Sequence, residues 1–225
     1  MRTIFLASLL ILFSATQAQK KKLVALSNEP LKTESMKMLD GGYEQYKQVA
    51  MQIWNHAELG YKEVKSTALL QETLKKEGFT VEAGVADIPT AFVATYGSGQ
   101  PVIGILAEFD ALPGLAQQAL PEKKTIEGKA GGHACGHHLI GAASVAAGIS
   151  IKKLIEEKKL KGTIKVFGCP AEEGGSGKVY MVRAGLFNDV DVAIHWHPGA
   201  ENGVTMTSAL ANSSAKFRFY GTSAH

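Results

Sequence analysis

The sequence of 225 residues predicts an α/β fold built on a mixed, largely parallel sheet flanked by helices. Three observations lead to this prediction. Segments with helical periodicity alternate with short apolar runs that are typical of buried strands. One such run, 102–107 (VIGILA), is apolar throughout, as expected for a strand covered on both faces. Several runs end in acidic or histidine residues, and sites in such sheets form outside the carboxyl ends of the strands.

The first 40 residues precede the predicted fold. Arg2 is followed by an apolar run at 4–13 and small residues up to Ala18, which is the pattern of a signal peptide spanning 1–18. We therefore expect an exported protein, either periplasmic or secreted. The apolar run is shorter than the roughly 20 residues of a membrane-spanning helix, which disfavours a membrane anchor. Residues 19–40 are polar and mixed in charge, and we expect a linker there.

The predicted fold begins with two helices. Apolar residues recur at helical spacing in 43–59 and in 63–76, and Gly78 ends the second helix. Apolar or alternating runs then predict three strands, at 79–81, 91–96 and 102–107.

A long helix is expected over 137–159, where alanines and glycines in the first half should allow close packing against the sheet. The pattern then predicts a strand at 163–167, a helix at 178–184 and a strand at 190–194. The last segments, 204–210 and 215–220, alternate like antiparallel strands and indicate the beginning of a different layer.

The composition is that of a globular protein with enough apolar material for a core. Hydrophobic residues make up 45% and charged residues 20%, and the formal net charge is +3. The basic run at 20–22 is too short to hold a nucleic acid, so we expect no nucleic-acid partner. We also expect no membrane association once the signal peptide is removed.

The most informative stretch is 131–138 (GGHACGHH), which places four metal-capable side chains within six residues. Cys135 and His137 are two positions apart, too close to face one way on a regular helix, but they can converge from a loop that enters a helix. His138 could be a further ligand or could only form a hydrogen bond beside the ligands. One loop can thus supply two ligands, and the others must come from elsewhere in the chain.

Two later segments carry suitable groups. Glu172 and Glu173 follow a buried strand in a tight loop, where one carboxylate could hold a metal while the other faces a metal-bound water. His195 and His197 share one side of a strand end, and only one of them need be a ligand.

Carboxylate, imidazole and one thiolate together suit zinc or manganese. Five or more candidate ligands leave room for two ions about 3.5–4 Å apart, so we expect one or two divalent metals per chain.

Two other interpretations of Cys135 compete with its role as a metal ligand. It could form a disulfide with Cys169, or pair with His137 as a thiol nucleophile. The histidines around Cys135 favour the metal, with Cys169 as a buried small residue.

Several segments resemble the aminoacylase and carboxypeptidase-G type metallopeptidase family, and in particular its amidohydrolase branch. The resemblance runs from about residue 51 to residue 225. It is carried by 132–141, 170–174 (PAEEG), 196–198 (WHP), 55–61 (NHAELGY) and 107–114 (AEFDALPG).

The resemblance implies a role for each candidate residue. Four residues would be metal ligands: Cys135, His137, Glu173 and His197. Glu172 would be the general base, and Asp110 would lie beside the ligands. His225 would begin a lid and contact the substrate in the partner subunit's site. The branch usually has Asp or Asn where this chain has His138.

The resemblance further implies a metal-dependent amidohydrolase or metallopeptidase. Its substrates would be N-acyl or N-aroyl amino acids (p-aminobenzoyl-glutamate-like) or small dipeptides, cleaved by a metal-activated water. Residues 41–212 would form the N-terminal part of the catalytic domain, and 213–225 would begin an α+β lid through which two chains dimerise. Family members are about twice as long, so a last histidine ligand is expected beyond this sequence and the fragment alone should be inactive. The rival readings are a thiol hydrolase that uses Cys135 and a metal-binding protein without turnover.

Overall fold

The structure is a computed structural model that describes residues 28–204 without a break, together with 208, 210, 211, 213, 215 and 217–222. The helices are α1 Glu29–Gly41, α2 Tyr43–His56, α3 Val64–Lys76, α4 His137–Glu156, α5 Glu172–Gly175 and α6 Gly177–Arg183, with a 3-10 turn, η1, at Val85–Asp87. The strands are β1 Thr80–Ala83, β2 Phe92–Ser98, β3 Val102–Glu108, β4 Leu112–Pro113, β5 Gly131–Gly132, β6 Gly162–Cys169 and β7 Val192–Ile194. Every helix and strand predicted between residues 43 and 194 is confirmed, to within three residues at each end.

The main sheet has five strands in the order β1-β2-β6-β3-β7. β2 is antiparallel to both β1 and β6, whereas β3 is parallel to both β6 and β7. Only β2 therefore runs against the other strands of this sheet, and the predicted mixed, largely parallel sheet is confirmed. Because β3, β6 and β7 are parallel, the residues that follow them meet at one edge of the sheet, which is where sites form in such folds.

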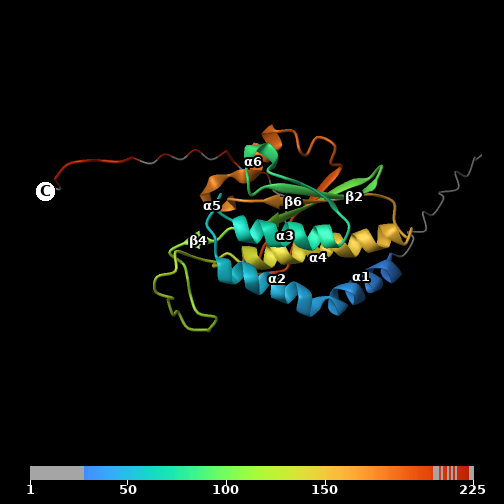
Figure 1. Cartoon of the computed structure of the whole chain (residues 1–225), viewed down its shortest axis with the longest axis horizontal. Coiled ribbons are helices and arrows are strands. Elements are labelled where there is room, and N and C mark those ends of the chain that lie inside the picture. The colour runs from blue at the N-terminus through green and yellow to red at the C-terminus, as the bar shows by residue number, and fades with distance from the viewer. Residues whose placement is uncertain are drawn as a thin grey trace, which may run out of the picture.

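Helices cover both faces of this sheet (Figure 1). On one face, where α1 to α4 stack, Ile164 and Val166 of β6 pack with Val145 and Ile149 of α4 in a buried apolar cluster. On the other face, Phe167 of β6 belongs to a second cluster that includes a methionine of α6. Neighbouring residues of β6 thus face opposite layers, and fully burying each such side chain contributes about 1.5–3 kcal/mol.

α4 lies at the centre of the helical layer, and its small residues bring it close to the sheet. A Cβ added at Gly148 would lie 2.5 Å from Val166 Cγ2, and one at Gly141 would lie 2.8 Å from the Glu108 carbonyl oxygen. The predicted close packing of this helix is therefore confirmed. Among the described residues, α4 is the one helix long and apolar enough to cross a membrane, and 67% of its most apolar window is buried inside the molecule. Such burial is typical of a core helix.

Two predictions need correction. Residues 29–40 of the expected linker belong to α1, which packs on α4 through a 2.6 Å contact between Ser35 Oγ and Ser150 Oγ. No residue of α1 is fully buried, so its polar composition concealed a helix. The strands expected at 204–210 and 215–220 are wrong for the residues described there, which belong to neither helix nor strand. Within the described part of the chain these segments pack against no other layer, and Phe219 is 91% exposed. The signal peptide predicted at 1–18 lies outside the described residues.

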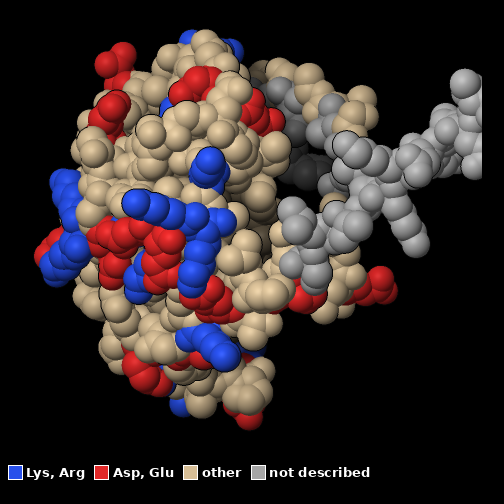
Figure 2. Space-filling view, turned by 90° about the vertical axis from the view of Figure 1, so that its right-hand side faces the viewer, with Lys and Arg blue, Asp and Glu red and all other residues tan. Residues whose placement is uncertain are grey.

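On the face shown in Figure 2, Lys and Arg side chains lie interspersed with Asp and Glu side chains. Surface ion pairs include Lys165 with Asp189 at 2.7 Å and Lys76 with Glu72 at 2.8 Å. Exposed pairs of this kind contribute only about 0–1 kcal/mol each. The fold therefore depends on its two apolar clusters rather than on these charges.

Candidate metal centre

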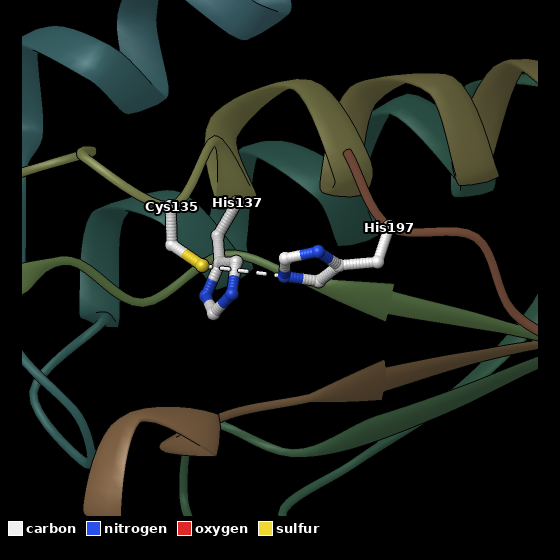
Figure 3. Close-up of side chains that lie close together, drawn as sticks. All are labelled: Cys135, His137 and His197. Carbon is white, nitrogen blue, oxygen red and sulfur yellow. Dashed lines mark hydrogen bonds between the residues drawn. The ribbon is translucent and has the colours of Figure 1, made fainter. Parts of the chain in front are cut away.

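The first metal-capable side chains lie where the chain enters α4. Gly136, directly before this helix, has a φ of 82°, a conformation that glycine adopts without strain. The turn lets Cys135 and His137 converge, and the Cys135 thiol points toward the ring of His197 (Figure 3). A Cβ at Gly136 would lie 3.3 Å from Pro198 Cγ, so the segment after β7 passes close to the turn. Two distant parts of the sequence thus meet here.

Cys135 and His197 are in direct contact, with Sγ 3.2 Å from Nε2. The Nδ1–H of His197 donates to the Pro198 carbonyl at 2.9 Å, so Nε2 carries the lone pair that faces the thiol. Together with His137, these donor atoms lie within 4.8 Å of one another. Burial, and then the charge of Glu173, raise the pKa of the Cys135 thiol to about 11. The thiol therefore keeps its proton at neutral pH unless a cation replaces it.

The second group of donors lies after β6, in the irregular turn α5. His137 Nε2 is 3.9 Å from Glu172 Oε2 and 3.7 Å from Glu173 Oε1, and the three residues form a second set within 4.8 Å. The two carboxylates differ in exposure. The side chain of Glu172 is 42% exposed, whereas that of Glu173 is 19% exposed and its Oε1 is buried. One carboxylate is thus open to water and substrate, and the other faces the histidine.

The segment between α2 and α3 holds the turn that carries both glutamates. Ala171 has a φ of 54°, which is unfavourable for a residue with a Cβ. The buried Glu63 accepts a hydrogen bond from the Ala171 N–H at 2.8 Å, and the Tyr61 hydroxyl donates to the Gly175 carbonyl. Burial raises the pKa of Glu63 above its ordinary value. Contacts at both ends therefore fix the turn in place.

Asp110 connects the two donor groups. Its Oδ1 accepts a hydrogen bond from His137 Nδ1–H at 2.9 Å, and its Oδ2 accepts one from the Glu173 N–H at 2.8 Å. The first bond leaves His137 Nε2 as the free nitrogen, which is how carboxylates orient metal-binding histidines. Burial lowers the pKa of His137, but Asp110 outweighs this effect and the net pKa is raised. Asp110 thus lies beside the candidate ligands and contacts two of them.

Glu108 was not predicted to be a site residue, yet it lies within the same cluster. Its Oε1 accepts hydrogen bonds from Lys178 Nζ and from His195 Nε2, the latter at 3.0 Å, and its Oε2 is 3.3 Å from His137 Nε2. Burial opposes ionisation, but the hydrogen bonds from His195 and Lys178 lower the pKa of Glu108 to about 2. The signal that could have found it is an acidic residue at the last position of a buried strand, two residues before Asp110.

His138 is turned away from both donor groups. Its ring packs edge-on against Trp54, with centroids 4.9 Å apart, and lies 5.1 Å from the ring of His133. His133 Nε2 is 3.1 Å from the Ile53 carbonyl oxygen. Burial lowers the pKa of both histidines to about 4. These neutral rings form a buried aromatic contact between α2 and α4, and neither donor group includes them.

Both cysteines are free, so the alternative of a disulfide between Cys135 and Cys169 is not realised in the structure. Cys169 is fully buried, and burial raises the pKa of its thiol to about 12. It is the buried small residue that was expected. His225 lies outside the described residues.

Three buried donor atoms of the cluster have no hydrogen-bond partner among the described residues: His137 Nε2, Glu108 Oε2 and Glu173 Oε1. A buried polar atom left unpaired costs about 1–3 kcal/mol, and more when it is charged. A divalent cation would satisfy such atoms together, and thiol, imidazole and carboxylate donors suit zinc or manganese. The residues present therefore fit a divalent metal centre.

Comparisons with known proteins identify relatives of this chain. The model of Peptidase family M20/M25/M40 matches residues 104–221. One of the subunits of the p-aminobenzoyl-glutamate hydrolase of Escherichia coli (strain K12) is 46% identical over 188 residues, which cover 83% of this chain and 39% of that protein. The Xaa-Arg dipeptidase of Homo sapiens is 29% identical over 213 residues, covering 88% of this chain and 45% of that protein.

A solved structure gives the same result. A Bacillus subtilis protein, described as a dinuclear metal binding peptidase from the M20 family, superimposes with a TM-score of 0.59 at 26% identity. The match covers 69% of this chain and 44% of that one.

The chain spans less than half the length of the relatives named above. The matched segment, 104–221, contains both donor groups as well as Glu108 and Asp110, and it makes up just over half of the sequence. The resemblance seen in the sequence is thereby confirmed. The chain belongs to Peptidase family M20/M25/M40.

Proposed function

We propose that the full-length protein is a metal-dependent amidohydrolase. Its substrates would be N-acyl or N-aroyl amino acids, p-aminobenzoyl-glutamate among them, or small dipeptides. The observation that carries this proposal is the pairing of an exposed Glu172 with a largely buried Glu173 beside His137. The names of the bacterial and human relatives, a p-aminobenzoyl-glutamate hydrolase and a dipeptidase, support this substrate class.

Cys135, His137, Glu173 and His197 would hold one or two divalent ions. A bound ion of this kind lowers the pKa of water and polarises the amide carbonyl. Glu172 is exposed at the edge of the cluster, where it can take a proton from the attacking water and deliver it to the leaving amine nitrogen. General acid–base catalysis of this kind contributes typically about 10²–10⁴-fold to the rate.

The contact between Cys135 and His197 is the one observation that favours a thiol hydrolase. The pKa of about 11 for Cys135 opposes it, because a nucleophilic cysteine needs a stabilised thiolate. A thiol hydrolase would also leave Glu172 and Glu173 without a role. Alkylation of Cys135 separates the two mechanisms. Loss of activity with metal content unchanged would favour the thiol.

The decisive experiment is a hydrolysis screen with the full-length, metal-loaded protein. It compares p-aminobenzoyl-glutamate, other N-acyl amino acids and small dipeptides, before and after treatment with a chelator. We expect hydrolysis that the chelator abolishes and added zinc or manganese restores. Tight metal binding without hydrolysis of any of these substrates would instead indicate a metal-binding protein without turnover.

Two further proposals concern assembly and location. Export, either to the periplasm or outside the cell, rests on the leader pattern at 1–18, and fractionation of cells that produce the full-length protein tests it.

Dimerisation through a lid rests on the resemblance around His225. Mixing Glu172→Gln with His225→Ala homodimers tests a site shared between two chains. If His225 serves the partner's site, subunit exchange creates one intact site per mixed dimer and activity returns. A mixture that exchanges labelled subunits and stays inactive would contradict the shared site.

A further inference from the structure

Glu108 has a side chain whose two oxygens have different environments. The side chain is 3% exposed at the end of β3. Its Oε1 accepts hydrogen bonds from Lys178 and His195. Its Oε2 is buried and has no hydrogen-bond partner among the described residues. One half of the carboxylate is therefore held in place, and the other half points into the cluster with its lone pairs free.

The ring nitrogen that Oε2 faces also has no hydrogen-bond partner within the described ranges. His137 Nε2 lies 3.3 Å away, is buried, and is the ring nitrogen left free because Nδ1–H donates to Asp110. Two lone pairs at this distance repel unless a proton or a metal cation lies between them. At 3.3 Å the two atoms are close enough that one zinc ion could bind both of them.

The composition of the two donor groups points the same way. His137 belongs to both groups, with Cys135 and His197 on one side and the two glutamates on the other. Its single free nitrogen can bind only one ion. Two ions would therefore require donors beyond these two groups. Besides the last histidine expected beyond this sequence, Glu108 Oε2 is a buried oxygen beside the shared histidine, without a hydrogen-bond partner in the described part of the chain.

We propose that Glu108 is an additional metal ligand, binding through Oε2 the same ion as His137 Nε2, and that Lys178 and His195 position its carboxylate through Oε1. This inference rests on the proposed metal-dependent function. It gives a role to Lys178 and His195, because the carboxylates that bind metals are themselves held by hydrogen bonds. The competing explanation is a buried ion pair between Glu108 and Lys178 with no metal involved. That pair accounts for Oε1, and a protonated His137 at 3.3 Å would account for Oε2, so metal binding is the property that distinguishes the two explanations.

Metal binding to the full-length protein tests the proposal without any measurement of activity. The metal-free protein is titrated with Zn²⁺ in competition with a coloured chelator, and the number of bound ions and their affinities are determined. Glu108→Gln removes the ligand charge and keeps the size of the side chain. Glu108→Asp keeps the negative charge on a shorter side chain, so the carboxylate lies farther from His137. This variant tests the proposal if the glutamine variant does not fold. Asp191→Asn is the control, because Asp191 Oδ2 accepts a hydrogen bond from the Val102 N–H near the opposite end of β3, away from both donor groups.

We expect Glu108→Gln and Glu108→Asp to lose one ion, or to bind it at least about 10–100-fold more weakly, which is the range seen when only a group that orients a ligand is removed. Lys178→Met should weaken binding of the same ion, and Asp191→Asn should leave both affinities unchanged. With Co²⁺ in place of Zn²⁺, the charge-transfer absorption of the Cys135 thiolate should persist in Glu108→Gln while the ligand-field bands change.

Two results would overturn different parts of the argument. Wild-type affinities and unchanged Co²⁺ bands in both Glu108 variants would refute the role of Glu108 and leave the proposed function intact. Absence of bound metal in the wild-type protein would refute the proposed function itself.

Discussion

Substitution of Asp110 tests the arrangement of the metal centre most directly, because this residue accepts hydrogen bonds from two candidate ligand residues. Both partners are donors: His137 Nδ1–H at 2.9 Å and the Glu173 N–H at 2.8 Å. In Asp110→Asn one oxygen becomes an NH₂ group. One of the two buried donors must then face another donor.

The size of the effect follows from this mismatch. A buried donor left unpaired costs about 1–3 kcal/mol, so we expect the free energy of unfolding of the metal-free protein to fall by that amount. If the His137 ring takes its other tautomer to accept from the new NH₂ group, Nε2 carries a proton and cannot bind a cation. We therefore expect the metal affinity to fall about 10–100-fold.

Urea unfolding of the metal-free, full-length protein measures the first effect, and competition with a coloured chelator measures the second. Asp191→Asn is the matched control near the opposite end of β3. Its Oδ2 accepts a hydrogen bond from the Val102 N–H at 2.7 Å, which an asparagine oxygen can also accept. The reasoning fails if Asp110→Asn binds metal as tightly as the wild type and loses no more stability than Asp191→Asn.

The remaining predictions concern other glutamates and one glycine in each of helices α1 and α4. Glu172→Gln should lower turnover about 10²–10⁴-fold with metal content unchanged, whereas Glu173→Gln should lose metal as well. Equal metal contents of the two variants by elemental analysis would contradict this division of roles. Glu63→Ala should lower the free energy of unfolding by about 1–3 kcal/mol, because it leaves a buried N–H unpaired, whereas Glu63→Gln keeps an acceptor. Because burial raises the pKa of Glu63 in the folded state, wild-type stability in urea should fall as pH rises through that pKa, and Glu63→Gln should lack this decrease. Gly148→Ala should destabilise the protein, because overpacking at a 2.5 Å contact costs about 1–3 kcal/mol and outweighs the helix preference of alanine. Gly41→Ala should stabilise it, because a Cβ there would meet nothing within 4 Å. Thermal unfolding that shifts both variants in the same direction would contradict this pair of predictions.

The fold could be predicted where the signal is local. Apolar periodicity located α2, α3 and α4 because each buries one face, and the continuous run of β3 indicated a strand covered on both sides. α1 was missed because it buries no residue completely, so its sequence carries little periodic signal. The pair β4–β5 was also missed, since two-residue strands depend on contacts between residues far apart in sequence. The residues described in 215–220 show the converse case. Their alternation predicted strands, but a strand needs a partner and a layer to cover it.

For the candidate site too, the residues with a local sequence signal could be predicted and the others could not. Cys135, His137 and His197 could be recognised from motifs that keep several metal-capable groups close in sequence. Glu108 and Lys178 come from different elements, and only the packing of α6 against the end of β3 brings them into contact. Which oxygen of a carboxylate stays unpaired is decided by this tertiary contact. The sequence contained the residue types, whereas the roles of Glu108 and His195 as neighbours of the ligands emerge only from the folded arrangement.

The charges around His137 explain why this cluster favours a cation. Four carboxyl groups and a thiol surround one imidazole, and Lys178 is the lysine that hydrogen-bonds to one of these groups in the described part of the chain. Burial and the neighbouring carboxylates keep the Cys135 thiol protonated in the metal-free protein. A divalent cation reverses this balance, because each acidic group that repels the thiolate attracts the ion. Metal binding through Cys135 would therefore release the thiol proton, and it would stabilise the folded state by about 2.7 kcal/mol when the free metal is at 100 times its dissociation constant. The carboxylates that repel a thiolate in the metal-free protein are thus the groups that would attract the metal ion.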